Sequence, residues 1–328
     1  MYKLQYNRGG TKGTHGMMFH HFHDDRKHIV EQGSISKEDF ENILDYYAER
    51  YNLIGADEYY YKALHDNLKD KDVVVTLDDN LLCQYDIAMP VLNKRNLSAF
   101  FFVYTSPIQG KAEKLEIYRH FRHLMFTDID EFYNAFFTVY EDKKTELNID
   151  FSVENKFDAG SYLIEYSFYS LNDRKFRYYR DEVLGQSGYY EIMDIMLEKY
   201  NYDVNQYSKI LWCKEKELRD ISNHGHLVGL HSHTHPTCLC EFDYNGQLNE
   251  YSTCKEIIEN CLGKKVTTAS YPCGSVNDDT ELIMKKLGIE IAFKELMISY
   301  KSKLMIPRED HSNIIREMKK NENNSIHK

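Results

Sequence analysis

Short apolar runs alternate with amphipathic helical patterns along the first hundred residues. The run Asp72–Leu77 (DVVVTL) is almost continuously β-branched, which is typical of a strand buried on both faces. Ser98–Thr105 (SAFFFVYT) has the same character, and Gly16–Phe22 (GMMFHHF) is a candidate first strand. Lys37–Arg50 carries apolar residues at helical spacing, and Leu81–Lys94 also has a helical pattern. This part of the chain therefore predicts strands that alternate with helices.

The same alternation returns from Leu227 onward. The expected strands are Leu227–Leu230, Val266–Tyr271, Ile289–Phe293 and a final short one at Leu304–Ile306, and the expected helices are Gln247–Leu262 and Asp278–Leu287. Strand, helix and strand repeated in this way imply parallel strands joined by crossover helices. The pattern leaves open whether they form a barrel or an open sheet.

The stretch from Pro107 to Tyr207 breaks this alternation. Helical patterns lie at Ala112–Phe126, Asp128–Asp142 and Tyr189–Tyr200, around an irregular aromatic segment. A connection between adjacent elements usually needs only about 2–6 residues. We therefore expect a mainly helical insertion or lid at 108–207, inside a (β/α) domain formed by residues 1–107 and 208–318. The polar residues 319–328 are expected to be a disordered tail.

Composition and charge are those of an ordinary folded protein. Of the 328 residues, 42% are hydrophobic and 28% are charged. The formal net charge of −11 argues against nucleic acid as a partner, because the average field would repel a polyanion. No run approaches the roughly 18–20 apolar residues that span a bilayer, and the first residues lack the apolar core of a signal peptide. We therefore expect a cytoplasmic protein with reduced cysteines and no membrane span; its oligomeric state stays open.

Two groups of ligand-type side chains directly follow apolar runs. Asp78 and Asp79 come after VVVTL, and His231 and His235 come after LVGL. The carboxyl ends of parallel strands meet at one face of an α/β fold. Two adjacent carboxylates repel each other unless a cation or a shared proton intervenes. Imidazoles with a carboxylate suit a divalent ion, and three protein ligands leave positions open for water and substrate, which is typical of a catalytic site.

The two aspartates have a simpler interpretation. Taken alone, they are equally compatible with a solvated turn that caps the next helix. Pro236 directly follows His235 and disfavours a helical His-x-x-x-His arrangement, because a proline pushes the preceding residue out of the helical region. We predict one bound divalent ion, with zinc as the first expectation and cobalt, nickel or manganese as alternatives that would accept the same ligands.

Three short motifs resemble those of the polysaccharide deacetylases, the NodB-type carbohydrate esterases. They are Thr76–Asn80 (TLDDN), His231–His235 (HSHTH) and Ser270–Gly274 (SYPCG). The resemblance covers roughly residues 16–108 and 208–311, and the segment between them resembles the helical insert of relatives tied to surface-polysaccharide synthesis. It implies an α/β fold, a deviant (β/α) barrel of seven strands with a mainly helical insertion.

The resemblance also implies a role for each motif residue. Asp79, His231 and His235 would bind the metal ion. Asp78 would be the general base that takes a proton from the attacking water. The backbone N–H of Cys273 would face the oxygen of the acyl group as it becomes negatively charged.

Two features depart from the family pattern. Ser270 stands where the family commonly has an arginine that orients the base, and Arg308 would then supply this charge from another strand end. The usual C-terminal histidine that acts as the general acid has no clear counterpart, and His311 is our candidate to protonate the leaving amine. The expected substrate contacts are His21, Tyr271 and Pro272.

Together these features predict a metal-dependent hydrolase that removes an N-acetyl or related acyl group from a saccharide precursor in glycan or lipopolysaccharide biosynthesis. Two alternatives remain open. One is a metal-dependent hydrolase that acts on a non-sugar amide. The other is a catalytically silent, carbohydrate-binding relative, which the two departures favour.

Overall fold

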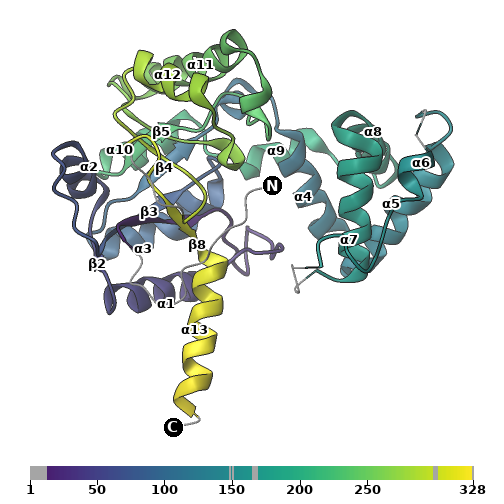
Figure 1. Ribbon diagram of the computed structural model, residues 1–328, viewed down its shortest axis with the longest axis horizontal. Helices are drawn as coiled ribbons and strands as arrows, with labels where there is room; N and C mark the ends of the chain where they lie inside the picture. Colours follow the sequence, from purple (N-terminus) through teal and green to yellow (C-terminus); the bar gives the residue numbers. More distant parts are fainter. Residues whose placement is uncertain (1–12, 148, 150, 165–168, 298–301, 327–328) are drawn as a thin grey trace. The chain divides into compact units, whose positions relative to one another are not determined.

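The computed structural model describes residues 13–147, 149, 151–164, 169–297 and 302–326 (Figure 1). Its contacts divide the chain into two compact units. One comprises the residues up to Glu113 and from Lys209 onward, and the other comprises Lys114–Ser208. The first unit is built on a parallel sheet, whereas the second takes up most of the stretch in which the strand pattern is interrupted.

Seven parallel strands of the first unit form a nearly closed barrel. They are β1 (His15–Phe19), β3 (Asp72–Leu77), β4 (Phe100–Val103), β5 (Leu227–Leu230), β6 (Thr268–Ser270), β7 (Ile291–Phe293) and β8 (Arg308–Asp310). Their order is β7-β6-β5-β4-β3-β1-β8, and the short β2 (Asn52–Leu53) pairs with β3. Ile306 bridges the gap, because its N–H donates to the oxygen of Ala292 at 2.9 Å and its own oxygen accepts from Lys294 at 2.8 Å. The predicted seven-stranded barrel is thus confirmed.

Helices cover the outside of this barrel. They are α1 (Lys37–Ala48), α2 (Ala56–Leu64), α3 (Met89–Lys94), α10 (Glu215–Asn223), α11 (Tyr244–Leu262), α12 (Asp278–Lys286) and α13 (His311–Ile326). Ser36 caps α1. Its hydroxyl accepts from the N–H of Asp39, whose carboxylate accepts in return from the N–H of Ser36, both at 3.0 Å. α13 leaves the barrel directly after β8 (Figure 1).

Some element bounds differ from those expected. β1 stops at Phe19 rather than at Phe22, because the chain turns there and Phe22 instead bridges to Ile35. The last strand lies at residues 308–310 and not at 304–306, since the oxygen of Pro307 accepts from Gly16 and aligns the residues after it with β1. Residues 319–326 are helical rather than a disordered tail, because they contain no proline or glycine to end α13; residues 327–328 lie outside the described part.

The interior of the barrel changes from aromatic to polar toward the carboxyl ends of its strands. Phe100, Phe102 and Phe293 pack together with ring centroids 5.1–5.8 Å apart. Above them, the guanidinium of Arg308 lies 5.9 Å from the centre of the Phe102 ring. Gly16 makes room for it, because a Cβ there would lie only 3.0 Å from the Cγ of Arg308. A buried positive charge therefore lies against an aromatic ring within the barrel.

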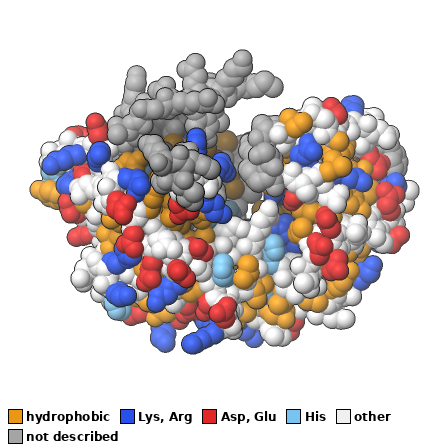
Figure 2. Space-filling model, turned by 90° about the horizontal axis from the view of Figure 1, so that it is seen from below, with side chains coloured by type: hydrophobic (Ala, Val, Ile, Leu, Met, Phe, Trp, Pro, Cys, Tyr) orange, Lys and Arg blue, Asp and Glu red, His pale blue; other side chains and the backbone are white. Residues whose placement is uncertain are grey.

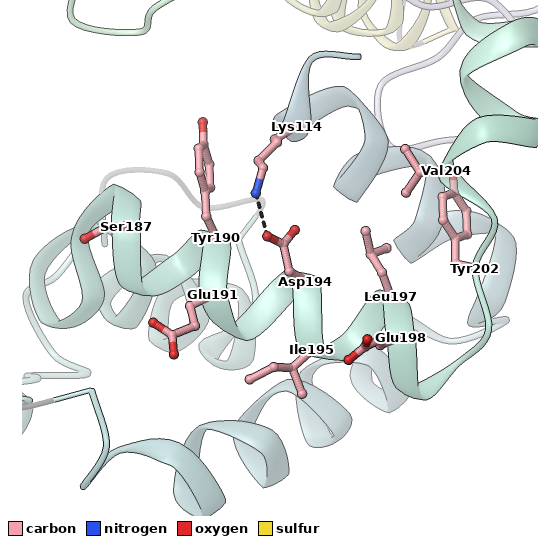
Figure 3. Close-up of a pocket in the computed structure, with 10 residues that line it drawn as sticks. All are labelled: Lys114, Ser187, Tyr190, Glu191, Asp194, Ile195, Leu197, Glu198, Tyr202 and Val204. Atoms are coloured by element: carbon pink, nitrogen blue, oxygen red, sulfur yellow. Dashed lines mark hydrogen bonds and ion pairs between the residues drawn. The ribbon is translucent and has the colours of Figure 1, made fainter. Parts of the chain in front are cut away.

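The second unit is helical, as expected of the insertion. Its elements are α4 (Lys114–Met125), α5 (Ile129–Lys143), α6 (Phe151–Glu154), α7 (Leu171–Tyr178), η3 (Tyr179–Leu184) and α8 (Gly185–Lys199), and α9 (Val204–Leu211) crosses its boundary. Aromatic rings form its core; Phe176 lies 4.9 Å from Phe136 and 5.5 Å from Phe132. An open hollow of about 770 Å³ beside α8 is lined by Tyr190 and by Lys114, whose ammonium pairs with Asp194 (Figure 3).

Acidic, basic and hydrophobic side chains are intermingled on the face shown in Figure 2. Within the described ranges, every helix is too short or too polar to cross a lipid bilayer.

Candidate metal centre

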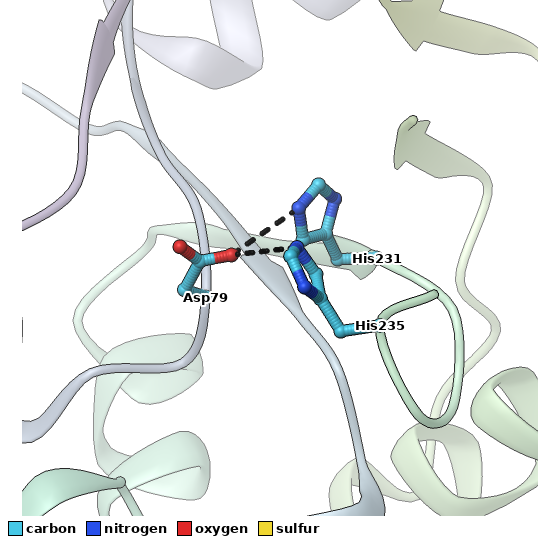
Figure 4. A group of neighbouring side chains, drawn as sticks. All are labelled: Asp79, His231 and His235. Carbon is cyan, nitrogen blue, oxygen red and sulfur yellow. Dashed lines mark ion pairs between the residues drawn. The ribbon is translucent and has the colours of Figure 1, made fainter. Parts of the chain in front are cut away.

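Asp79, His231 and His235 meet at the carboxyl ends of β3 and β5 (Figure 4). Oδ1 of Asp79 lies 3.3 Å from Nε2 of His231 and 3.3 Å from Nε2 of His235. One ligand atom of each residue lies within 4.8 Å of the other two. Because β4 separates the two strands in the sheet, only the folded barrel brings these residues together.

This donor set fits a divalent ion. In a tetrahedral site with bonds of about 2.1 Å, neighbouring ligand atoms lie roughly 3.4 Å apart, and the separations here are 3.3 Å. Oδ1 of Asp79 is buried, and no hydrogen bond from the described residues satisfies it. A buried carboxylate oxygen without a partner is costly, so a cation between these three atoms would stabilise the arrangement.

A hydrogen bond sets the tautomer of His231. Its Nδ1 lies 3.1 Å from the backbone oxygen of Ser270 and 2.6 Å from the hydroxyl of the same residue. A carbonyl oxygen only accepts, so Nδ1 carries the proton and the lone pair of Nε2 points toward Asp79. Metal-binding histidines usually have this kind of support from a neighbouring backbone oxygen.

The electrostatics favour the ionised form of Asp79. Burial by itself raises the pKa of this carboxyl, but His235 and His231 lower it well below its usual value. Burial lowers the pKa of His235, but the charge of Asp79 raises it, and the pKa is raised overall. Asp79 is therefore a carboxylate at neutral pH, the form that binds metal ions.

Glu250 shapes the histidine loop, a role that sequence reasoning missed. Its carboxylate, on α11, accepts from the backbone N–H of His233 at 2.9 Å and of Thr234 at 2.8 Å, and from the Thr234 hydroxyl at 2.7 Å. Nδ1 of His233 lies 2.8 Å from the hydroxyl of Thr105, so this ring is not part of the cluster. The same loop holds His235 at a φ of 59°. In the sequence, an acidic residue on the apolar face of the helix expected at Gln247–Leu262 is the signal that could have indicated Glu250.

Asp78 is buried beside the cluster and paired with Arg308. Each side chain is 1–2% exposed, and Nη1 of Arg308 lies 2.7 Å from Oδ1 of Asp78. The other carboxylate oxygen lies 3.8 Å from Nε2 of His231. Burial raises the pKa of Asp78, while Arg308 and His231 lower it, and the result is a lowered pKa. Arg308, the first residue of β8, thus lies beside Asp78 as we predicted. The hydroxyl of Ser270 contacts the same carboxylate at 3.3 Å.

His20 directly follows β1, and the charges of Asp79 and Asp78 act on it. Burial lowers the pKa of His20, and these charges oppose that effect. His21, rather than His20, is the residue that we predicted to contact the substrate. His21 is partly exposed, and its ring centre lies 6.4 Å from that of His20.

His311 begins α13 and is 6% exposed. Its Nε2 lies 2.9 Å from the backbone oxygen of Gly33, and its ring stacks on Phe19 with centroids 5.8 Å apart. Burial lowers its pKa, which the charge of Asp310 opposes. One ring nitrogen is therefore already engaged within the protein.

The turn after β6 carries the third motif. Tyr271 is fully buried and its hydroxyl donates to the oxygen of Leu304 at 2.8 Å, and Pro272 is buried as well. Both side chains are therefore buried, and their predicted contacts with the substrate stay predictions. Cys273 is exposed and adopts a φ of 49°. The N–H groups of Gly274 and Ser275 donate the hydrogen bonds that close this turn. The N–H of Cys273 takes no part in these bonds.

Comparison with known families identifies this arrangement. Residues 188–292 match the polysaccharide deacetylase family. This part of the chain is therefore similar to polysaccharide deacetylases. The matched range contains the histidine motif and the turn after β6, whereas Asp78 and Asp79 precede the insertion and lie outside it. No curated protein matches the chain.

Solved structures have a similar fold. The Streptococcus pyogenes deacetylase PplD, in complex with acetate, has a TM-score of 0.53 and 14% identity over 93% of this chain and 97% of its own. IcaB from Ammonifex degensii has a TM-score of 0.54 and 16% identity over 90% and 91%. A de-N-acetylase from Aggregatibacter actinomycetemcomitans has a TM-score of 0.52 and 13% identity over 93% of this chain and 98% of its own. At such identities the likeness concerns the fold alone.

Proposed function

We propose that this protein removes an N-acetyl or related acyl group from a saccharide precursor in glycan assembly, with a divalent ion, zinc as first expectation, held by Asp79, His231 and His235. The observation that carries the proposal is the buried Oδ1 of Asp79, which accepts no hydrogen bond from the described residues and lies 3.3 Å from both imidazole nitrogens. The polysaccharide deacetylase match and the acetate in the PplD structure support the choice of reaction.

Each of the neighbouring groups has a step to perform. When bound, a divalent ion lowers the pKa of water and polarises an acyl oxygen. Asp78 accepts the proton of the attacking water, and Arg308 keeps that carboxyl ionised. The N–H of Cys273 donates to the acyl oxygen as negative charge develops on it.

The general acid is better placed at His20 than at His311, the residue that we first predicted. The charges of both aspartates act on His20, whereas Nε2 of His311 already contacts the oxygen of Gly33 at 2.9 Å. The leaving amine needs a proton, which His20 supplies in this proposal.

His20→Ala should lower kcat on an N-acetylated saccharide by about 10²-fold, because a positioned acid contributes at least that much. Its kcat on 4-nitrophenyl acetate should stay near the wild-type value, since nitrophenolate leaves without a proton. His311→Ala should retain most of the saccharide activity. A larger loss of kcat in the His311 variant than in the His20 variant would return the acid role to His311.

Metal removal tests the proposal as a whole. We expect the purified protein to hold a divalent ion by elemental analysis and to deacetylate N-acetylated saccharides. A chelator should abolish this activity, and zinc, cobalt, nickel or manganese should restore it. Turnover of non-sugar amides alone would overturn the saccharide assignment. A metal affinity that Asp79→Ala leaves unchanged would overturn the metal site.

Ser270 was the sequence feature that favoured a catalytically silent relative. The structure weakens that argument, because Arg308 supplies a positive charge to Asp78 from β8. We therefore favour the enzyme over a binding protein.

A further inference from the structure

A third acidic side chain, Glu295, lies beside the turn of the third motif. It follows β7 at the carboxyl edge of the barrel. A Cβ on Gly274 would meet its Cδ and Oε1 at 2.7 Å, so the Glu295 side chain lies directly against this glycine. Gly274 also has a φ of +62°, a conformation that favours glycine. The turn that carries Cys273 thus brings its backbone close to the Glu295 carboxylate.

Charged side chains of the proposed active site influence the pKa of Glu295. Burial has the largest effect on its pKa and raises it; Arg308 and Lys294 lower it, and Asp78 and Asp310 raise it, so that the pKa is raised overall. The carboxylate therefore interacts with both members of the Asp78–Arg308 pair, and its position against Gly274 places it beside the acyl-binding turn.

Glu295 differs from the other two acids in what pairs with it. Asp78 has Arg308 at 2.7 Å, and Asp79 faces two imidazoles. Across the described ranges, no group donates a hydrogen bond to the Glu295 carboxylate, which is half-buried. A bound substrate that displaces water from this carboxylate must supply donors of its own, because a desolvated acceptor without a donor is costly.

We infer that Glu295 accepts a hydrogen bond from a ring hydroxyl of the saccharide that bears the acyl group, and so selects sugars over simple amides and esters. The inference rests on the proposed function. Cys273, whose amide would face the acyl oxygen, directly precedes Gly274, so Glu295 lies beside the proposed acyl site. Ring hydroxyls are the donors that a saccharide offers there, and a hydrogen bond to a carboxylate is stronger than one between neutral groups.

Glu295→Ala and Glu295→Gln test this inference on two substrates. One is an N-acetylglucosamine oligosaccharide, and the other is 4-nitrophenyl acetate, which has the acyl group without ring hydroxyls. We expect Glu295→Ala to raise KM for the saccharide about tenfold, as loss of a charge-assisted hydrogen bond would, and to leave the ester kinetics within about twofold of wild type. Glu295→Gln should fall between the two, because its amide oxygen still accepts.

Glu290→Gln is the matched control. Glu290 precedes β7 at the opposite end of the strand, where its carboxylate accepts from the hydroxyl of Tyr60. This variant should behave as wild type on both substrates.

Each contrary result has its own meaning. An unchanged saccharide KM in Glu295→Ala would overturn the inference and leave the proposed function standing. Equal losses on saccharide and ester would show a structural role and also overturn it. If Glu295→Gln were as impaired as Glu295→Ala, the partner would be a cation rather than a hydroxyl. A wild-type protein that cleaves the ester but no saccharide would overturn the proposed function, and the inference with it.

Discussion

Asp78→Asn should lower kcat for deacetylation by about 10²–10⁴-fold and leave the affinity for the metal ion unchanged. Asparagine has nearly the same shape as aspartate but does not take up a proton from water. Its amide oxygen can still accept from Nη1 of Arg308, which lies 2.7 Å from the carboxylate in the wild type. The three proposed ligands are not altered, so metal binding should persist in a protein that has lost its base.

Metal titration and steady-state kinetics on the same preparations measure both parts of this expectation. Asp79→Ala is the matched comparison, because it changes the neighbouring carboxylate and should lose metal binding and activity together. The base role is contradicted if the Asp78 variant keeps wild-type kcat. If it instead loses the metal ion, Asp78 is a ligand rather than a base.

Arg308→Met should reduce the free energy of unfolding by about 3–5 kcal/mol, the usual cost of leaving one member of a buried ion pair without its partner. Both side chains are at most 2% exposed, so water does not replace the lost arginine. Methionine fills much of the same space above Phe102, over which the guanidinium lies at 5.9 Å. The loss should therefore come from the unpaired charge of Asp78 more than from a cavity.

The double variant with Asp78→Asn and Arg308→Met isolates that charge. It should be more stable than Arg308→Met alone in urea denaturation, because no buried charge is left unpaired. Equal stability of the two would show that Arg308 acts by packing only.

Acidification should reveal the same effect with a definite sign. In the wild type the pKa of Asp78 is lowered, so its stabilising contribution is present above the unfolded pKa and is lost as the pH falls through the folded one. In Arg308→Met, burial without the guanidinium should raise that pKa, and protonation then relieves the penalty. The difference in unfolding free energy between wild type and variant should shrink as the pH falls through the raised pKa of Asp78 in the variant.

Sequence patterns predicted the proposed ligands because their positions depend on a simple rule. Asp79, His231 and His235 follow apolar runs, and the carboxyl ends of parallel strands meet at one face. The three side chains indeed come together, and Arg308 reaches Asp78 as expected. The alternation of apolar runs with helical patterns predicted parallel strands, whereas the seven-stranded barrel was predicted from the resemblance to the polysaccharide deacetylases.

What the sequence could not indicate depended on where each strand ends and on which side chains the turns bury. β1 stops at Phe19, so the alternation of side chains along a strand does not extend to His20 and His21, and His20 was missed. Tyr271 belongs to a motif that resembles an active-site turn, yet its ring is directed inward to the oxygen of Leu304. Local periodicity carries no information on either point, because both are set by contacts with segments distant in the chain.

The pair formed by Asp78 and Arg308 also determines when an active molecule can arise during translation. The two residues are 230 positions apart. At about 5–20 residues per second, a ribosome needs on the order of 10–50 s to pass from one codon to the other. Until the β8 segment emerges, the nascent barrel stays open between β7 and β1, and its base lacks the guanidinium that keeps it ionised. The proposed active site is therefore incomplete until Arg308 has been made.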